Sequence, residues 1–405
     1  MKFVLAVAYL IPSFTSLVAT VEGSLFSSNN DNDKPTYGHD LFQVQTPSPP
    51  TAAAAAAFNK DANAVFNANA NAAFNKPGQT AMPSLEPTVG SRVNDGNGWN
   101  SGHVRVYRFD DVGSSWTQSS WTQLGQDIDG EAAYDGSGLS VSLSSDGNTV
   151  AIGATYNGGN GTNSGHVRVY RFDDDGSSWA RLGQDIDGEA AYDSSGWSVS
   201  LSSNGNTVAV GALSNDGNGN NSGHARVYRF DGDGSSWAQL GDDIDGEAAG
   251  DQSGWSVSLS SDGNTVAVGS PYNDGNGWNS GHARVYRFDG DGSSWAQLGD
   301  DIDGEAACDY SGYSVSLSSD GNTVAVGARL NDGNGSDSGH VRVYRRDGDG
   351  SSWTQLGQDI DGEAAYDGSG LSVSLSSDGN TVAVGADGND GNGTPNSGHV
   401  RVYEI

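Results

Sequence analysis

The chain has 405 residues, of which 60 are glycine and only 17% are charged. Its 51 acidic and 19 basic side chains give a formal net charge of −32, which argues against nucleic acid as a partner because nucleic-acid binding needs a basic surface. A single cysteine, Cys308, excludes an internal disulfide, so the fold must rely on its apolar core.

The first 23 residues have the pattern of a secretory signal peptide. Lys2 supplies the positive start, Phe3 to Ile11 form a short apolar core, and small residues follow around Ala19 to Gly23. The apolar run is too short and too interrupted for a membrane span. We therefore expect a secreted or cell-surface protein that has no membrane span after signal cleavage.

Residues 24–92 are polar and low in complexity. They contain a proline-rich piece, an alanine run at 52–57, and phenylalanines at positions 58, 66 and 74 in an Ala/Asn background. A spacing of eight residues drifts around a helix and does not hold one face. We expect a disordered or weakly helical linker.

Residues 93–405 repeat one unit several times. The motif Ser-Gly-His marks each copy, and the middle copies are 58 residues apart. Close repetition is typical of a scaffold built from stacked copies of one supersecondary unit. The motif histidines are His103, His166, His224, His282, His340 and His399.

Each unit holds four candidate strands, which in the copy from Ser253 to Tyr310 are residues 255–260, 265–269, 283–288 and 295–298. In the first strand Trp255, Val257 and Leu259 alternate with serines, which is the period of a strand. Residues 262–264, Asp-Gly-Asn, provide a tight turn to the second strand.

Four antiparallel strands per unit predict an all-β fold, a β-propeller of four-stranded blades. The bulky face of the first strand and its small serine face would let neighbouring blades interdigitate. The strand motifs allow five blades, closed by the strand around Trp121, or five blades plus a partial sixth. A β-solenoid is the structural alternative, although its parallel coils do not suit the hairpin turns.

Short motifs in this unit resemble the FG-GAP repeat of integrin α-chain propellers. They are Ser253-Gly254-Trp255-Ser256-Val257, Gly269-Ser270-Pro271 and the strand Gly-His-x-Arg-Val-Tyr. The resemblance covers residues 93–405 and implies a propeller with a role in cell adhesion. The aromatic residue that the family has before the first glycine is replaced by Ser253, and the family's calcium loop between the first two strands is reduced to Ser-Asp-Gly-Asn. The resemblance therefore does not imply calcium at that position.

The acidic linkers between units offer a different candidate calcium site. Each has carboxylates at positions 1, 3, 5 and 9, and a hard cation such as Ca²⁺ needs several oxygen ligands at such spacing. Glycine at position 4 departs from the EF-hand pattern, so solvated turns and caps are the alternative. The candidate ligands are Asp127, Asp129, Glu131 and Asp135; Asp185, Asp187, Glu189 and Asp193; Asp243, Asp245, Glu247 and Asp251; Asp301, Asp303, Glu305 and Asp309; and Asp359, Asp361, Glu363 and Asp367.

No catalytic constellation breaks the repeat. Each motif histidine begins a strand in the same setting, which favours a structural hydrogen-bonding role, and the strand arginines are expected to pair with acidic loops of the same or the next blade. Cys308 takes the place of Tyr134, Tyr192, Gly250 and Tyr366 in other copies, so its thiol is not expected to be catalytic. We expect no enzyme activity and no cofactor besides Ca²⁺.

The Asn-Asp-Gly-Asn-Gly loops and the acidic linkers are expected to lie on one face of the propeller. These loops differ most between copies and include Trp99 and Trp278, so this face is the expected site for an extracellular protein or glycan. The leading hypothesis is a secreted, non-enzymatic binding protein, and the alternative is an acidic calcium-binding structural or cell-wall protein. Glycosylation sequons are present at Asn160, Asn220, Asn334 and Asn392.

Overall fold

The computed structural model describes residues 8–9, 17–18, 64–67, 88–110, 120–173, 177–231, 236–289, 294–348, 350, 352–391 and 395–405. The expected signal peptide and most of the expected linker lie outside these residues. Among the residues described, no helix is long and apolar enough to cross a membrane.

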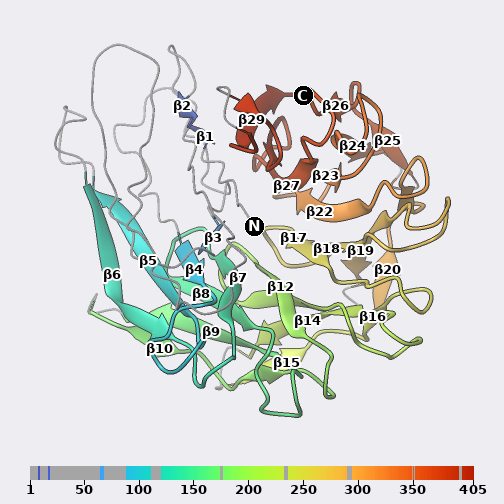
Figure 1. The fold of residues 1–405 in the computed structure, drawn as a ribbon. Coiled ribbons are helices and arrows are strands. Elements are labelled where there is room, and N and C mark those ends of the chain that lie inside the picture. Colours follow the sequence, from blue (N-terminus) through green and yellow to red (C-terminus); the bar gives the residue numbers. More distant parts are fainter. Residues whose placement is uncertain are drawn as a thin grey trace, which may run out of the picture.

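Six sheets follow one another around a curved path, with the first strand of each repeat toward the middle (Figure 1). The first sheet contains β3 (Ala64–Asn67), β4 (Thr88–Ser91), β5 (His103–Asp110) and β6 (Ser120–Asp129). The second contains β7 (Ser137–Leu143), β8 (Thr149–Ala154), β9 (His166–Phe172), β10 (Trp179–Arg181) and β11 (Ile186–Asp187). The third contains β12 (Ser195–Leu201), β13 (Thr207–Ala212), β14 (His224–Phe230), β15 (Trp237–Gln239) and β16 (Ile244–Asp245).

The fourth sheet contains β17 (Ser256–Leu259), β18 (Thr265–Ser270), β19 (His282–Phe288), β20 (Trp295–Gln297) and β21 (Ile302–Asp303). The fifth contains β22 (Ser311–Leu317), β23 (Thr323–Ala328), β24 (His340–Arg346), β25 (Trp353–Gln355) and β26 (Ile360–Asp361). The sixth contains β27 (Ser369–Leu375), β28 (Thr381–Ala386) and β29 (His399–Glu404). Outside these sheets, β1 (Ala8–Tyr9) pairs with β2 (Leu17–Val18).

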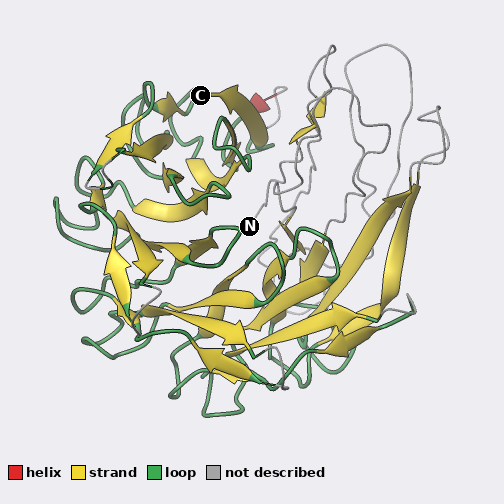
Figure 2. Ribbon diagram, turned by 180° about the vertical axis from the view of Figure 1, so that it is seen from behind, coloured by secondary structure: helices red, strands yellow, loops and turns green. Residues whose placement is uncertain are grey.

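The predicted four strands of the repeat are confirmed. In the fourth sheet β17, β18, β19 and β20 are hydrogen-bonded in that order, and every neighbouring pair is antiparallel. This hairpin topology gives a propeller of radially arranged sheets and excludes the solenoid alternative. Figure 2 shows the strands and the loops that join them from the opposite side.

The sequence did not predict the short strand β21. Its residues Ile302 and Asp303 pair with Ala283 and His282 of β19, on the same edge as β20. The acidic linker therefore begins as an interrupted continuation of the outer strand, which places its first carboxylates beside the motif histidine.

The number of sheets corresponds to the predicted alternative of five blades plus a partial sixth. Five sheets have four or five strands, and the sixth has three. The strand around Trp121 is β6, and it pairs with β5 and not with the last sheet. The first sheet also includes β4 (Thr88–Ser91), so it begins within the segment expected to be linker.

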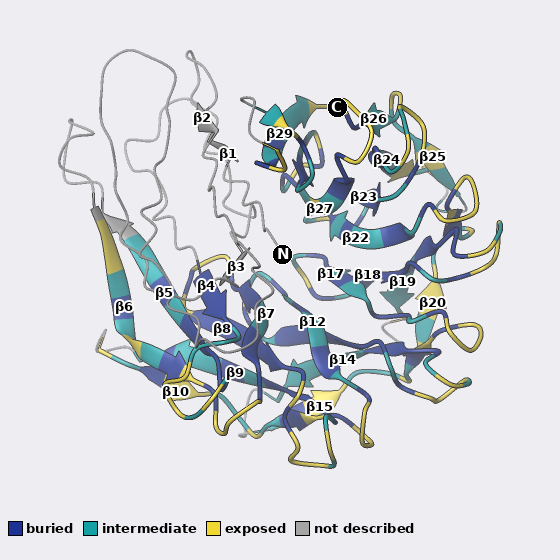
Figure 3. Ribbon diagram, in the orientation of Figure 1, coloured by how far each residue is buried: buried dark blue, intermediate teal, exposed yellow. Residues whose placement is uncertain are grey.

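Neighbouring sheets interdigitate through the alternating first strand. Val257 and Leu259 pack against Ala209 and Val227 of the preceding sheet. On the opposite side, the Ser256 hydroxyl donates to the Gly312 carbonyl of the next sheet at 2.9 Å. The predicted interlocking of bulky and small faces is thus confirmed, and the buried residues gather in the middle strands (Figure 3).

The outer rim of each junction has its own contact. The indole N–H of Trp295 on β20 donates to the carbonyl of Leu240 in the preceding sheet at 2.7 Å. The equivalent bond joins Trp179 to Leu124 at 2.8 Å and Trp237 to Leu182 at 2.7 Å. Burying the apolar part of tryptophan while its N–H is satisfied stabilises the contact between sheets.

Candidate functional site

Three of the four carboxylates of one acidic linker have separate partners. Asp243 accepts hydrogen bonds from Arg226 of its own sheet, at 2.9 and 2.8 Å, and Glu247 pairs with Arg284 of the next sheet. Asp251 is buried and accepts the backbone N–H of Ala248 at 3.0 Å. The spacing of the linker therefore does not by itself gather its four carboxylates around one point.

Asp251 and its equivalents close the linker as caps. Besides the backbone N–H of Ala248, Asp251 accepts a hydrogen bond from the Asn273 side chain of the next sheet at 3.1 Å. Asp193 makes the same contact with Asn215 at 3.2 Å, and Asp367 with Asn389 at 2.9 Å. The ninth position of the linker is thus occupied by intramolecular hydrogen bonds.

At four junctions an arginine on the third strand bridges two neighbouring sheets. Its guanidinium pairs with an aspartate of its own sheet, as one of the two predicted alternatives has it. The second partner is the glutamate of the preceding linker, and not an acidic loop of the next blade as the other alternative had it. The triplets are Arg168 with Asp185 and Glu131, Arg226 with Asp243 and Glu189, Arg284 with Asp301 and Glu247, and Arg342 with Asp359 and Glu305.

These ion pairs change the acidity of the aspartates. Burial opposes ionisation of Asp243, but the hydrogen bonds and charge of Arg226 outweigh it and lower the pKa of this carboxyl below its ordinary value. Asp245 and Asp303 have the opposite shift. Partial burial, together with the charge of Asp243 or Asp301, raises their pKa. One carboxylate in each of these linkers therefore retains unfavourable negative charge.

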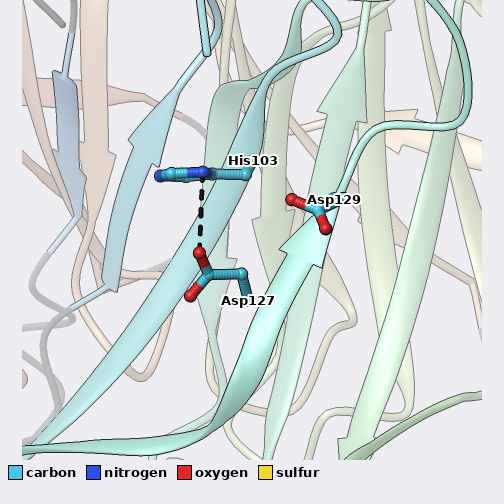
Figure 4. A group of neighbouring side chains, drawn as sticks. All are labelled: His103, Asp127 and Asp129. Atoms are coloured by element: carbon cyan, nitrogen blue, oxygen red, sulfur yellow. Dashed lines mark ion pairs between the residues drawn. The ribbon is translucent and has the colours of Figure 1, made fainter. Parts of the chain in front are cut away.

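The motif histidines lie beside these carboxylates. Figure 4 shows His103 on β5 facing Asp127 on β6, with Nδ1 3.9 Å from Oδ2 and Asp129 nearby on the same strand. In the third sheet the Nδ1 of His224 lies 3.7 Å from Asp243, and burial lowers the pKa of this imidazole although Asp243 opposes the shift. The arrangement favours a neutral, buried imidazole.

The structural hydrogen bond expected from the histidines is missing at three Nδ1 atoms. Those of His224, His282 and His340 are buried and have no hydrogen-bond partner. Each histidine forms a compact group with one carboxylate from its own sheet and one from the preceding linker. Such groups contain the donor types that bind transition metals.

The variable loops and the linkers lie together, as expected. The N–H of Tyr134 donates to the carbonyl of Trp99 at 2.7 Å, and the N–H of Cys308 donates to that of Trp278 at 2.8 Å. We call the surface formed by these loops and linkers the loop face. Five large aromatic residues on it are about two thirds exposed, namely Trp99 65%, Tyr134 64%, Tyr192 63%, Trp278 67% and Tyr366 67%.

Three of these aromatic residues occupy a backbone position that suits glycine. Tyr134, Tyr192 and Tyr366 have φ of 72, 73 and 68°, and the equivalent Gly250 has φ of 93°. A bulky side chain at such φ strains the backbone, and strained positions gather at functional sites. Exposed tyrosines therefore occur where glycine would be less costly.

The loop face also carries sequons. The Asn160 amide donates to the Gly188 carbonyl at 2.8 Å, and the Asn334 amide donates to the Gly362 carbonyl at 2.8 Å. Each nitrogen also donates to the following carbonyl, of Glu189 and Glu363 respectively, and an attached glycan would replace one of its two N–H donors. Asn220 is exposed, and its side-chain oxygen accepts a hydrogen bond from the Asn221 amide at 3.1 Å. Asn392 lies outside the described residues.

A cluster near the middle of the loop face was missed by sequence reasoning. Trp197 on β12, Trp255 directly before β17 and Tyr313 on β22 occupy the same position in three successive repeats, and their ring centroids are 5.1 and 5.2 Å apart. Tyr272 lies 5.7 Å from Trp255 and 5.1 Å from Tyr310. The cluster joins residues from three sheets into one aromatic surface.

An ion pair borders this aromatic surface. Arg329 lies over the ring of Tyr313 at 5.4 Å, and its Nη2 is 3.2 Å from Asp387 of the next sheet. We call these seven residues the divergent cluster, because the residue at each of these positions varies among the copies: Trp197, Trp255, Tyr272, Tyr310, Tyr313, Arg329 and Asp387. Comparing the copies position by position would have revealed them.

An open depression lies at the junction between the first two sheets on the same face. It has a volume of about 460 Å³ and is lined by Tyr156, Glu131, Asp135 and Asn157, among others. Tyr156 is the equivalent of Tyr272 two copies earlier and is 40% exposed. Aromatic and acidic groups thus also meet outside the divergent cluster.

Comparison with known proteins gives one family. The model of the FG-GAP repeat matches residues 185–228, 244–286 and 302–344. No curated protein matches the chain.

Among solved structures, the periplasmic gluconolactonase of Pseudomonas aeruginosa is 17% identical, with a TM-score of 0.47 over 80% of this chain and 89% of that chain. A Bacteroides uniformis protein assigned as a 6-phosphogluconolactonase is 11% identical, with a TM-score of 0.41 over 80% of this chain and 92% of that chain.

Proposed function

Since residues 185–344 carry three consecutive repeats of the FG-GAP family, we propose that the chain is a secreted, non-enzymatic β-propeller that binds an extracellular partner through its loop face. The main support for this proposal is the place of the residues that differ between copies of the repeat. The strands are nearly identical from sheet to sheet, whereas the residues that differ gather on one face, and such variable loops on a rigid scaffold are typical of binding sites.

The residue types on this face also support recognition. Exposed tyrosine and tryptophan provide large, rigid contact surfaces and dominate binding energy in many interfaces. The neighbouring linkers are acidic, so the partner is a neutral glycan or a protein with a neutral or basic surface. A role in cell adhesion follows from the family resemblance.

A binding screen tests this proposal directly. The full chain, recovered from the medium of secreting cells, is screened against immobilised glycans and extracellular proteins. We expect a partner whose affinity falls about tenfold or more in the double variant Trp278→Ala/Tyr366→Ala, since an exposed aromatic anchor contributes more than about 1.4 kcal/mol.

Trp121→Ala is the matched control, because Trp121 is exposed on the edge strand β6, away from the loops. Equal losses in the control and the double variant, or no bound partner in either library, would reject the loop face as the binding surface. Retention of the unprocessed chain inside the cells would reject secretion.

A second candidate function is an acidic calcium-binding structural protein. The raised pKa of Asp245 and Asp303 favours it, because carboxylates with uncompensated charge gain most from a cation. Titration calorimetry with Ca²⁺ separates the two functions. Several weak calcium sites, abolished by Asp245→Asn and Asp303→Asn, would support the structural role, and no heat would oppose it.

A further inference from the structure

We propose that a transition-metal dication of the Zn²⁺ type binds at three sheet junctions, each time between one histidine and two carboxylates contributed by successive repeats. The groups are Glu189, His224 and Asp243; Glu247, His282 and Asp301; and Glu305, His340 and Asp359. This site is independent of the loop-face function and involves a different chemistry from the calcium set expected from the linkers.

Each group is assembled by the propeller and not by a local motif. In the fourth sheet His282 begins β19, Asp301 directly precedes β21, and Glu247 comes from the linker before the sheet. One ligand atom from each residue lies within 4.8 Å of the others. The repeat therefore creates the same three-residue site at successive junctions.

The histidines supply the observation that points to a ligand. His224, His282 and His340 are only 3, 2 and 3% exposed, yet their Nδ1 atoms have no hydrogen-bond partner. An unsatisfied buried polar atom destabilises a fold by about 1–3 kcal/mol. The same nitrogen atom lacks a partner at three junctions, which indicates that this nitrogen binds a metal ion.

The distances fit two ligands of one metal better than a hydrogen bond. The Nδ1 atoms of His224, His282 and His340 lie 3.7, 3.7 and 3.8 Å from the nearest aspartate oxygen. Hydrogen bonds of this kind are about 2.7–3.2 Å long. Bonds of about 2.0–2.2 Å at tetrahedral angles place two zinc ligands about 3.4 Å apart, so a small inward movement would suffice.

The side chains at each junction carry a net negative charge that a divalent cation can neutralise. Glu247 and Asp301 share the single positive charge of Arg284, and Asp303 brings a third carboxylate oxygen to 4.0 Å from the His282 Nδ1. Three carboxylates and one guanidinium give a local charge of about −2, which one divalent ion neutralises. Arg284 holds Oε1 of Glu247, and Oε2 has only a 3.4 Å contact from the Asn273 amide.

The donor set selects the kind of metal. Imidazole nitrogen with carboxylate oxygen suits Zn²⁺ and similar ions, whereas Ca²⁺ requires six to eight oxygen ligands. The buried Asp251 and its equivalents, already occupied as caps, take no part.

The experiment counts metal equivalents on the full chain, purified without a histidine tag and treated with chelator. Titration calorimetry with Zn²⁺, and the visible absorption of Co²⁺ as a tetrahedral probe, are recorded in parallel. We expect at least three equivalents of Zn²⁺. Each of His224→Asn, His282→Asn and His340→Asn should remove one equivalent and about one third of the Co²⁺ absorption of these sites.

His399→Asn is the matched control. His399 has Glu363 at 3.7 Å, but β29 has no outer strand among the described residues to supply the aspartate. Its substitution should leave the three equivalents unchanged. Glu247→Gln, which can still accept a hydrogen bond from Arg284, should weaken only the His282 site and provides a test that does not alter the buried imidazole.

Absence of Zn²⁺ binding to the wild-type chain would overturn the proposal, as would a triple histidine variant that remains folded and binds as many equivalents. Loss of metal in His399→Asn equal to that in His282→Asn would also overturn it. The screen for an extracellular partner uses variants of the loop face, which are not metal ligands. A failure of that screen therefore does not affect the count of Zn²⁺ equivalents.

Discussion

Gly269 of β18 and Gly312 of β22 meet backbone against backbone across a sheet junction. A Cβ added to Gly269 would approach the carbonyl oxygen of Gly312 closer than 3.0 Å, and Gly211 and Gly327 have the same relationship with the sheets that follow them. This glycine belongs to the second short motif of the repeat, so its conservation between copies has a direct steric reason: two sheets cannot approach this closely if either carries a side chain here.

We expect Gly269→Ala to lower the free energy of unfolding by about 1–3 kcal/mol, because the obstructing atom is backbone and cannot rotate away. Urea unfolding measures the change. Gly348→Ala is the matched control, since nothing lies within 4 Å of its added Cβ. Equal stability of the two variants would contradict the close approach of the sheets.

The arginine bridge gives a second prediction. Arg284→Gln leaves Glu247 and Asp301 without their guanidinium at a junction where the Arg284 side chain is only 11% exposed. Glu247 and Asp301 are 48% and 28% exposed, so losing the buried guanidinium should cost less than breaking a fully buried pair, about 1–3 kcal/mol. Arg181→Gln removes an exposed pair with Asp185 and should cost less than about 1 kcal/mol. A smaller loss at Arg284 than at Arg181, by chemical denaturation, would show that the bridge does not hold the sheets together.

The outer tryptophans allow a test of one hydrogen bond. Trp237 is buried and donates to the Leu182 carbonyl of the preceding sheet. Trp237→Phe removes the donor but keeps most of the apolar surface, so we expect a loss of about 1 kcal/mol or somewhat more. Trp278→Phe, at an exposed position, should change stability by less than about 0.5 kcal/mol. Thermal unfolding of both variants measures the two losses. If the losses are equal, the hydrogen bond at the outer rim does not stabilise the contact between sheets.

The hairpin turns predict a pH dependence. Burial opposes ionisation of Asp262, but the hydroxyl of Ser260 at 2.6 Å and the N–H of Asn264 at 3.0 Å stabilise the carboxylate, and the pKa of Asp262 is lowered from 3.8. A lowered folded-state pKa contributes stability that is fully present above the unfolded value and is lost as pH falls through the folded value. Asp262→Asn should therefore reduce the fall in stability below about pH 4.

One copy already contains the amide at this position. The side-chain oxygen of Asn204 accepts hydrogen bonds from the Ser202 hydroxyl at 2.9 Å and from the Asn206 N–H at 3.0 Å, so the variant turn can retain its geometry. Asn204→Asp is the reciprocal variant and should steepen the acid dependence. Unfolding free energies measured from pH 6 to pH 2.5 give the slope of stability against pH for each variant. Identical slopes in the wild type and the variants would contradict a contribution of Asp262 to the acid dependence.

The strands and their alternation followed from local chemistry. Val257 and Leu259 point one way and Ser256 the other because successive side chains of a strand point to opposite faces, and the Asp-Gly-Asn turn specifies the hairpin. These features depend on neighbours in the chain, so the sequence predicted the four-stranded unit. The pairing of arginines with acidic linkers followed from charge alone, although not the fact that one arginine serves two sheets.

The sequence by itself thus determined the repeating antiparallel unit, the interlocking first strands and the grouping of loops with linkers on one face. Only the tertiary structure decided how many sheets follow one another, that Asp243, Glu247 and Asp251 of one linker have separate partners, and that His282 meets Asp301 and Glu247. It also brought Trp197, Trp255 and Tyr313, one repeat apart from each other, into one cluster. Such contacts join residues of successive repeats, and their distances depend on how closely the sheets pack, which no local pattern of residues encodes.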